Sequence, residues 1–268
     1  MYSVVIITLN EERALPACLS SISSCDDIVV LDSGSSDRTR ELARNAGARF
    51  FTRPFDNFAG QRNHAQRDIP FRHPWVFHLD ADERMTPELD SECRAAARRT
   101  DLDGFRVAPK MLFQGRWIPH CTDYPAYQAR FVRAPRFEFI QVGHGQREAP
   151  SMVLENLKEG YLHDLSVYGE PAWLEKHRRY AAAEARAITQ ASGDDSLGLL
   201  FSADRLVRRR ALKRAAARLP FRPAFRFAYQ YVLRRGFLDG KQGLRYCVLL
   251  ARYESFIAEE IERLKQTR

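Results

Sequence analysis

The stretch WVFHLDADE, residues 75–83, joins an apolar run to a pair of carboxylates, Asp80 and Asp82. Such a run is typical of a buried strand, and open α/β sheets bind ligands at the carboxyl ends of their strands. Alternate residues of a strand share a face, so both side chains point the same way. Paired carboxylates there suit a hard divalent ion and the diphosphate that it neutralises. Alternatively, the pair forms a solvated turn before a helix capped by Thr86.

Two more apolar runs precede polar loops nearer the N-terminus. YSVVIIT, residues 2–8, leads through LNEE to a helix predicted over residues 15–22. IVVL, residues 28–31, leads to DSGSSDRT, residues 32–39, where Gly34 permits a tight turn and Ser36 or Asp37 can cap a helix. A third strand is expected over residues 48–51. Strand and helix therefore alternate to about residue 100, which predicts βαβ units on a largely parallel sheet.

Known nucleotide-binding fingerprints are missing from this region. The chain contains neither a GxGxxG nor a Walker sequence, which disfavours a Rossmann dehydrogenase and a P-loop NTPase. Asp32 nevertheless stands at a strand end, like the acidic residue that binds a ribose or base in doubly wound folds. The alternative is that Asp32 only caps the turn before the next helix.

Several motifs in order resemble a known family. TLNEE (8–12), DSGSSDRT (32–39) and DADE (80–83) stand in the order and spacing of the family 2 inverting glycosyltransferases of GT-A fold. FAGQRN (58–63), GFR (104–106), YPAYQARF (124–131) and HGQRE (144–148) look most like the bacterial lipopolysaccharide-core β-glucosyltransferase branch. The resemblance covers about residues 1–185. Many relatives have His directly followed by Glu, whereas three residues separate His144 from Glu148 here.

The resemblance implies a fold and a division of the chain. The fold class is α/β, with a GT-A type open, mostly parallel sheet that has helices on both faces, plus a C-terminal helical basic extension. Residues 1–190 form the catalytic domain, with a nucleotide-binding half (1–100) and an acceptor half (101–190). Residues 191–268 form the helical extension, which is a candidate for membrane association.

The resemblance also implies roles for particular residues. The residues expected to bind the nucleotide or donor sugar lie at strand ends or at a helix start: Thr8, Asn10, Glu11, Asp32, Gln61, Arg62, Asn63, Asp80 and Arg130. Glu12 is as good a candidate as Glu11. Asp82, assisted by Asp80, is expected to ligate Mg²⁺ or Mn²⁺. The planar guanidinium of Arg62 suits phosphate oxygens. Alternatively, residues 61–63 are a solvated helix start and Arg130 is an exposed strand residue.

An inverting transfer needs a general base to accept the proton of the acceptor hydroxyl. Glu148 is the first candidate and His144 the second. Glycines flank His144, so its loop is open to solvent or ligand. His163 and Asp164 form a further candidate pair. The alternative for Glu148 is a surface carboxylate paired with a neighbouring cation.

Composition agrees with a cytoplasmic enzyme. A chain of 268 residues with 45% hydrophobic content can bury one α/β core and an appended subdomain. The five cysteines are odd in number and lack CxxC spacing, which disfavours a disulfide framework and a structural zinc site. We expect no secretory signal, and no run reaches the roughly 18 apolar residues of a membrane-spanning helix.

Positive charge is concentrated in the last quarter of the chain. Residues 205–268 contain 17 Lys or Arg and 5 Asp or Glu, whereas residues 1–204 contain 25 and 29. Basic residues 208–210, 213, 214 and 218 precede an apolar series at helical spacing: Phe221, Phe225, Ala228, Tyr229 and Val232. Such a helix either lies on an anionic bilayer or packs by its apolar side on the catalytic domain. No nucleic-acid-binding motif is present.

These observations predict a metal-dependent glycosyltransferase. It would move a hexose-type sugar from a nucleoside-diphosphate sugar to a hydroxyl of a lipopolysaccharide-core or other lipid-linked glycan. We expect a cytoplasmic protein, free or peripheral on the cytoplasmic face of the inner membrane, with no nucleic-acid partner. One alternative is a sugar-phosphate nucleotidyltransferase, but LNEE lacks the glycine-rich loop that it would need. Another is a non-catalytic membrane- or nucleic-acid-binding scaffold, which the intact acidic set disfavours.

Overall fold

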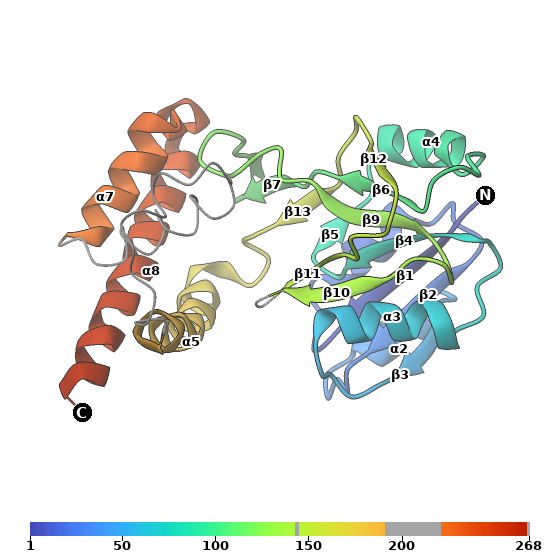
Figure 1. The fold of residues 1–268 in the computed structure, drawn as a ribbon, viewed down its shortest axis with the longest axis horizontal. Helices are drawn as coiled ribbons and strands as arrows, with labels where there is room; N and C mark the ends of the chain where they lie inside the picture. The colour runs from blue at the N-terminus through green and yellow to red at the C-terminus, as the bar shows by residue number, and fades with distance from the viewer. Residues whose placement is uncertain (143–144, 191–220, 267–268) are drawn as a thin grey trace. The chain divides into compact units, whose positions relative to one another are not determined.

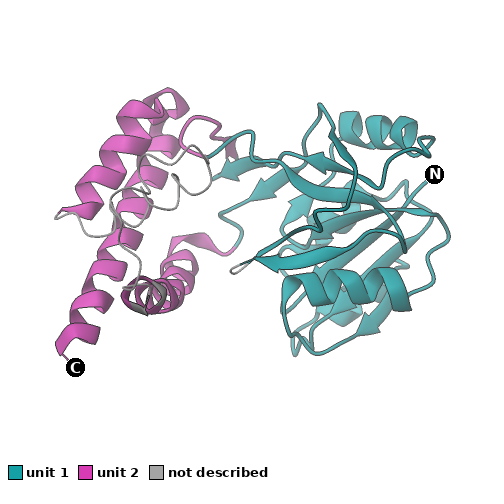
Figure 2. Ribbon diagram, in the orientation of Figure 1, with its two compact units in different colours: residues 1–115, 123–167 teal, residues 116–122, 168–268 magenta. Residues whose placement is uncertain are grey.

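The computed structural model describes residues 1–142, 145–190 and 221–266. The chain divides into two compact units, which Figure 2 colours separately. The first unit comprises residues 1–115 and 123–167, and the second comprises residues 116–122 and 168–268.

A seven-stranded sheet forms the centre of the first unit (Figure 1), in the order β12-β6-β9-β4-β1-β2-β3. Its strands are β1 (Ser3–Thr8), β2 (Ile28–Asp32), β3 (Arg49–Thr52), β4 (Trp75–Asp80), β6 (Gly104–Val107), β9 (Gln128–Arg133) and β12 (Leu154–Asn156). Strands β1 to β4 are mutually parallel, whereas β9 runs antiparallel to both β4 and β6. The predicted α/β class with a mostly parallel sheet is therefore confirmed.

Helices cover both faces of this sheet, as the sequence predicts. Helices α1 (Leu15–Ser21), α2 (Thr39–Asn45) and α4 (Pro87–Ala96) share one apolar core with Val4 and Ile6 of β1. Helix α3 (Phe58–Asp68) packs with Val5 on the other face. Neighbouring strand residues point to opposite faces, so the apolar residues 4–7 of this buried strand serve both cores. Thr86 caps α4, its hydroxyl accepting from the Leu89 N–H at 3.2 Å.

Five further strands of the first unit belong to smaller sheets. Strands β10 (Phe139–Val142) and β11 (Gly145–Glu148) pair antiparallel. Strand β13 (Leu162–Asp164) pairs antiparallel with β5 (Glu83–Arg84) and parallel with β7 (Lys110–Phe113). Because β5 begins three residues after β4 ends, this pairing brings His163 beside Asp82 and Glu83.

The second unit is mainly helical in its described part, as predicted for the extension. It contains α5 (Gly169–Gln190), α7 (Arg222–Ala228), the π-helical turn η2 (Tyr229–Leu233), the 3₁₀ turn η3 (Gly236–Asp239) and α8 (Gly240–Gln266), together with the short β8 (Arg116–Trp117). Among the described helices, none is long and apolar enough to cross a membrane. The basic residues 208–218 lie outside the described residues.

The units divide between Val167 and Tyr168, and the catalytic domain of residues 1–190 stays a prediction. Helix α5 belongs to the second unit, because its Ala181 and Ala185 pack in one apolar cluster with residues 256 and 257 of α8. An Ala-rich helix presents little side-chain bulk, so it can pack closely on a second helix.

Candidate active site

The candidate site lies at the carboxyl edge of the parallel strands. Thr8 at the end of β1 is in register with Asp32 at the end of β2, and Ile7 is in register with Asp80 at the end of β4. The strand order reverses at β1, since β2 and β3 lie on one side of it and β4 on the other. Open α/β sheets bind ligands at such a switch point. The topology therefore brings Asp32 and Asp80 to the same edge.

Asp32 is buried and is held by its own loop. It accepts hydrogen bonds from the Thr8 hydroxyl at 2.8 Å and from the N–H groups of Gly34 and Ser35 at 2.9 and 2.7 Å. Gly34 has φ 103°, a left-handed conformation that favours glycine. In this state Asp32 determines the shape of the β2–α2 loop, and the predicted contact with a nucleoside stays a prediction.

The β1–α1 loop is joined to the same segment. Asn10 has φ 57°, and its side-chain oxygen accepts from the Ser36 N–H at 2.8 Å. The Glu11 N–H donates to the hydroxyl of the first residue of α2 at 2.8 Å. The Glu12 carboxylate accepts from the Arg38 N–H at 3.2 Å. Both loops therefore form one hydrogen-bonded rim, in which Glu12 has a structural partner.

Asp80 lies between two buried guanidinium groups. Arg62 donates to Asp80 Oδ1 at 2.7 Å, and Arg130 donates to Asp80 Oδ2 at 3.1 Å. Arg130 also donates to Glu83 Oε1 at 2.8 Å and to the Tyr161 hydroxyl at 3.2 Å. Glu83 Oε2 in turn accepts from the Asp80 N–H at 2.8 Å. These contacts fix the orientation of the Asp80 side chain.

The pKa values of Asp80 and Glu83 are shifted in opposite directions. Burial opposes ionisation of Asp80, but the charges of Arg130 and Arg62 hold its pKa well below its usual range. For Glu83, burial dominates, and with the repulsion of Asp80 it outweighs the attraction of Arg130, raising the pKa of Glu83 to about 7. The cluster therefore keeps a negative charge on Asp80, which is 30% exposed at its side chain, next to two cations.

Sequence reasoning did not place Arg62 and Arg130 in this arrangement. Both were expected to contact phosphate or acceptor, and the structure instead pairs both with Asp80. Arg62 is fully buried, and two of its nitrogens, Nε and Nη1, have no hydrogen-bond partner among the described residues. Such groups are rare in native proteins and are costly. Arg130 is buried and forms ion pairs, so it is not the exposed strand residue that the alternative interpretation allows.

Asp82 differs from Asp80 in its surroundings. Its side chain is 28% exposed, and His163 Nε2 lies 3.3 Å from Asp82 Oδ2. His163 Nδ1 also lies 3.6 Å from Glu83 Oε1. Burial disfavours the protonated ring, but the hydrogen bond and charge of Asp82, together with Glu83 and Asp80, raise the pKa of His163 to about 9. An imidazolium therefore sits against the carboxylate that is expected to ligate a metal.

The donor atoms fit a divalent ion that the substrate helps to hold. Among the described residues, no three acidic, His or Cys side chains converge as a complete metal site. Mg²⁺ does not need one, since it is usually held by one or two carboxylates, waters and substrate phosphates. Asp82 Oδ1 has no hydrogen-bond partner within the described chain and is a suitable oxygen ligand. Asp80 has both carboxylate oxygens engaged by arginine.

The neighbours of Arg62 on α3 are also engaged by the protein. Gln61 is buried, and its side-chain amide donates to the Ser33 hydroxyl and to the Arg53 carbonyl, both at 3.0 Å. Asn63 exchanges two hydrogen bonds with the backbone of Phe139, at 2.8 and 2.9 Å. The three adjacent residues therefore connect α3 to four segments: the loops after β2 and β3, and the strands β4 and β10. They are not the solvated helix start that the alternative reading of the sequence allows.

Glu148, the first candidate base, lies at the end of β11. Arg106 Nε donates to its Oε1 at 2.7 Å, and Arg106 Nη2 approaches the same oxygen at 2.6 Å. The carboxylate is 23% exposed at its side chain. The cation beside Glu148 is thus Arg106 of β6, a partner 42 residues away that the sequence did not indicate. His144 lies outside the described residues.

Residues 3–140 match the domain described as Glycosyl transferase family 2. A lipopolysaccharide core biosynthesis glycosyltransferase, LpsC of Rhizobium meliloti, is 35% identical over 164 residues, which are 58% of this chain and 56% of that protein. An uncharacterised glycosyltransferase of Rickettsia typhi is 33% identical over 91 residues, or 34% of this chain and 30% of that one. The chain thus matches about half the length of LpsC and less of the second relative.

Solved structures show a looser likeness. S. aureus TarS 1–349 in complex with UDP-GlcNAc has a TM-score of 0.45 at 15% identity, covering 100% of this chain and 92% of that one. Glucosyl-3-phosphoglycerate synthase of Mycobacterium tuberculosis, in complex with Mn²⁺, UDP and glucosyl-3-phosphoglycerate, has a TM-score of 0.34 at 23% identity, covering 43% of this chain and 44% of that one.

Proposed function

This chain belongs to glycosyl transferase family 2, and we propose that it moves a hexose-type sugar from a nucleoside diphosphate to a hydroxyl of a lipid-linked glycan, with inversion at the anomeric carbon. The observation that carries this proposal is the pair Asp80 and Asp82 at the strand switch point. One is locked by two arginines and the other is partly exposed. A lipopolysaccharide-core glycan is the acceptor class favoured by the similarity to the Rhizobium meliloti protein.

The donor site would combine a fixed carboxylate with an accessible one. Asp82, with Asp80 beside it, would hold Mg²⁺ or Mn²⁺, and the ion would neutralise the diphosphate as it departs. Arg62 and Arg130 hold the Asp80 side chain by hydrogen bonds, and their charges favour its ionised form. Asn10, Glu11 and Asp32 shape the loops that would receive the nucleoside. The buried position of the arginines means that they would act on the diphosphate through Asp80 and through their charge.

The acceptor side would need a base. In an inverting transfer the acceptor oxygen attacks the anomeric carbon opposite the leaving diphosphate, and its proton passes to a carboxylate or imidazole. We assign this role to Glu148, with His144 as the second candidate. Arg106 would orient Glu148 and would have to leave one carboxylate oxygen available. Glu148 Oε2 has no hydrogen-bond partner among the described residues, which supports the assignment.

The proposal is tested by a donor screen. Purified protein is incubated with UDP-, GDP-, ADP- and dTDP-hexoses, a soluble glycan acceptor and either Mg²⁺ or Mn²⁺, and the released nucleoside diphosphate is measured. One nucleotide should support release that depends on acceptor and metal, and the product should carry an inverted anomeric configuration. Release that EDTA leaves unchanged would remove the metal from the proposal. A product of retained configuration would rule out the inverting reaction.

A further inference from the structure

Helix α7 and the turn η2 expose an apolar side to solvent. Their exposed positions recur every three or four residues and are all apolar: Phe221, Ala224, Phe225, Ala228, Tyr229, Val232 and Leu233. We call this set the outer face. Phe225 is 55% exposed and Leu233 is 74% exposed. A surface helix of a globular protein normally points such a stripe toward the core. The apolar stripe of α7 and η2 instead points toward solvent, which is the reverse of the usual orientation.

Polar contacts on the opposite side hold the helix in this orientation. Gln230 is buried, and its amide donates to the Cys121 carbonyl at 2.7 Å. Arg222 pairs with Glu254 of α8 at 2.7 Å. A rotation that buried the outer face would expose Gln230 and break both contacts. The reversed arrangement is therefore built into the second unit.

The charge around the outer face is positive. Residues 221–245 contain six Arg or Lys and one acidic residue, Asp239. Asp239 is buried and pairs with His120 at 2.7 Å, so it does not offset the exposed cations. Arg226, Arg235 and Lys241 have no acidic partner within the described residues. A second copy of the chain would bring the same positive charge to the face, and so repulsion disfavours self-pairing.

We propose that the outer face docks on an anionic lipid bilayer. Aromatic and aliphatic side chains would enter the headgroup boundary, while the flanking cations would pair with lipid phosphates. Tyr229 has the amphipathic ring that suits this boundary. Docking would bring the enzyme to an acceptor that is embedded in lipid. Only this purpose rests on the proposed function. The outer face contains the apolar series that the sequence indicated, and its exposure in the structure favours the bilayer over packing on the catalytic domain.

Cosedimentation with vesicles tests the docking. The full chain is mixed with phosphatidylcholine vesicles that do or do not contain one third phosphatidylglycerol. Each Arg or Lys near an anionic surface raises the partition coefficient about fivefold. Arg226, Arg235 and Lys241 together should therefore favour the anionic vesicles by about 10²-fold at low salt. Raising the salt should reduce the preference, because exposed charges are screened beyond about 10 Å at 0.1 M. Equal binding to both vesicles, or none to either, would overturn the proposal.

A double variant assigns the binding to the outer face. Phe225→Gln with Leu233→Gln should lower the partition coefficient by about 10²-fold, since each exposed side chain contributes about tenfold. Val153→Gln is the matched control, because Val153 is 56% exposed and belongs to the first unit. It should bind like the wild type. A double variant that still binds would overturn the assignment.

Two further measurements separate the other occupants and the proposed function. Sedimentation of the wild type without lipid should show a monomer, and a dimer that the double variant abolishes would mean that a second copy covers the face. A melting temperature that falls by more than a few degrees in the double variant would mean that the chain itself covers it. Both results would overturn the proposal. Donor turnover with a soluble acceptor should be unchanged in the double variant, so a failure of docking and a failure of catalysis are distinguishable.

Discussion

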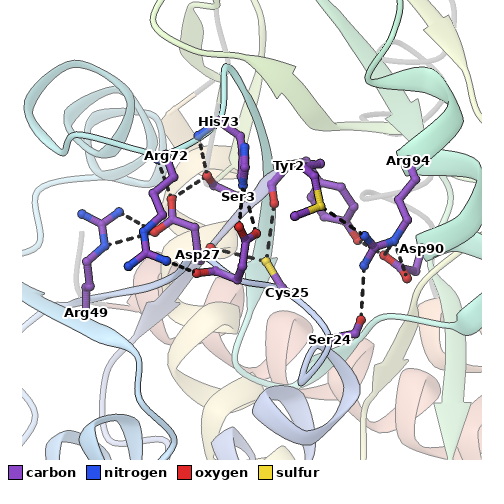
Figure 3. A network of polar contacts seen from close by, with 12 residues as sticks. Tyr2, Ser3, Ser24, Cys25, Asp27, Arg49, Arg72, His73, Asp90 and Arg94 are labelled. Carbon is purple, nitrogen blue, oxygen red and sulfur yellow. Dashed lines mark hydrogen bonds and ion pairs between the residues drawn. The ribbon is translucent and has the colours of Figure 1, made fainter.

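The two ends of the central sheet use aspartate in opposite ways. At the amino end, Figure 3 shows Asp27 surrounded by donors from three segments. Arg49 donates to Asp27 Oδ1 at 2.8 Å, while the Ser3 hydroxyl and the Arg72 N–H donate to Oδ2 at 2.6 and 2.8 Å. The side chain is 1% exposed. No part of this carboxylate is left for a ligand.

At the carboxyl end, Asp32 is likewise buried, but Asp80 and Asp82 are less enclosed. Asp82 is 28% exposed and has a partner on one oxygen, and Asp80 is 30% exposed and has an arginine on each oxygen. A carboxylate that is saturated by its own chain stabilises the fold, whereas one with an accessible oxygen can bind a cation or phosphate-bound metal. The acidic residues therefore differ in how much of each carboxylate remains accessible to a ligand. Their spacing in the sequence does not show this difference.

The largest effect on activity should follow from Asp82→Asn. The amide keeps the shape but removes the charge that would hold a divalent ion, so kcat/KM should fall by about 10³-fold, with the melting temperature within a few degrees of the wild type. Nucleoside-diphosphate release and thermal unfolding provide the two measurements. Asp101→Asn, at an exposed ion pair with Arg99, is the control and should change neither. A marked loss of stability in the Asp82 variant would place this residue with Asp27.

The largest effect on stability should follow from Asp27→Ala. Removing the buried carboxylate leaves Arg49, the Ser3 hydroxyl and the Arg72 N–H without their acceptor, so the free energy of unfolding should fall by about 3 kcal/mol. Turnover per folded molecule should stay within about twofold. The neighbouring Asp26→Ala is the control, since its exposed pair with His73 contributes little. Loss of turnover without loss of stability would break the distinction between the two ends of the sheet.

Asp27 should also make the stability of the protein depend on pH. Burial opposes ionisation of Asp27, but the hydrogen bonds from Ser3, Arg72 and Arg49 lower its pKa. The folded pKa lies below that of the unfolded chain, so its contribution is present above about pH 4 and is lost as the pH falls further. Urea unfolding below that pH should therefore show a shallower decline for Asp27→Ala than for the wild type.

Glu148 is intermediate between the saturated Asp27 and the accessible Asp82, because an arginine contacts one of its two oxygens. Its substitution should lower activity less than that of Asp82. Glu148→Gln keeps the hydrogen bond from Arg106 but cannot accept a proton, so kcat should fall by about 10²-fold while donor binding is unchanged. Glu155→Gln, an exposed carboxylate paired with Arg99, is the control. Weaker donor binding at normal kcat would instead give Glu148 a binding role, and His144 would become the first candidate base.

Much of the first unit could be predicted because its signals are local. The strands β1, β2 and β4 are continuous apolar runs, Gly34 marks a tight turn, and Thr86 caps α4 as expected. Each of these signals depends on residues within a few positions of one another. The positions of Asp32 and Asp80 at one edge follow from them, because parallel strands end on the same side.

The partners of the site residues could not be predicted in this way. Arg130 reaches Asp80 because β9 lies antiparallel beside β4, a pairing across 50 residues. His163 reaches Asp82 because β13 pairs with β5. Tyr161 and Glu83 received no role from the sequence, although Glu83 directly follows the carboxylate pair. Its contacts with Arg130 and His163 come from distant segments, and no local pattern encodes them.

The sequence by itself determined the alternation of strands and helices, the edge at which the carboxylates gather and the excess of positive charge toward the C-terminus. The tertiary structure decided which carboxylates are saturated, that Arg62 and Arg130 hold Asp80, and that the apolar side of α7 faces outward while Gln230 is buried. The physical reason is range. Strand and helix formation depends mainly on neighbouring residues, whereas burial and ion pairing depend on elements that are distant in sequence and meet only in the folded chain.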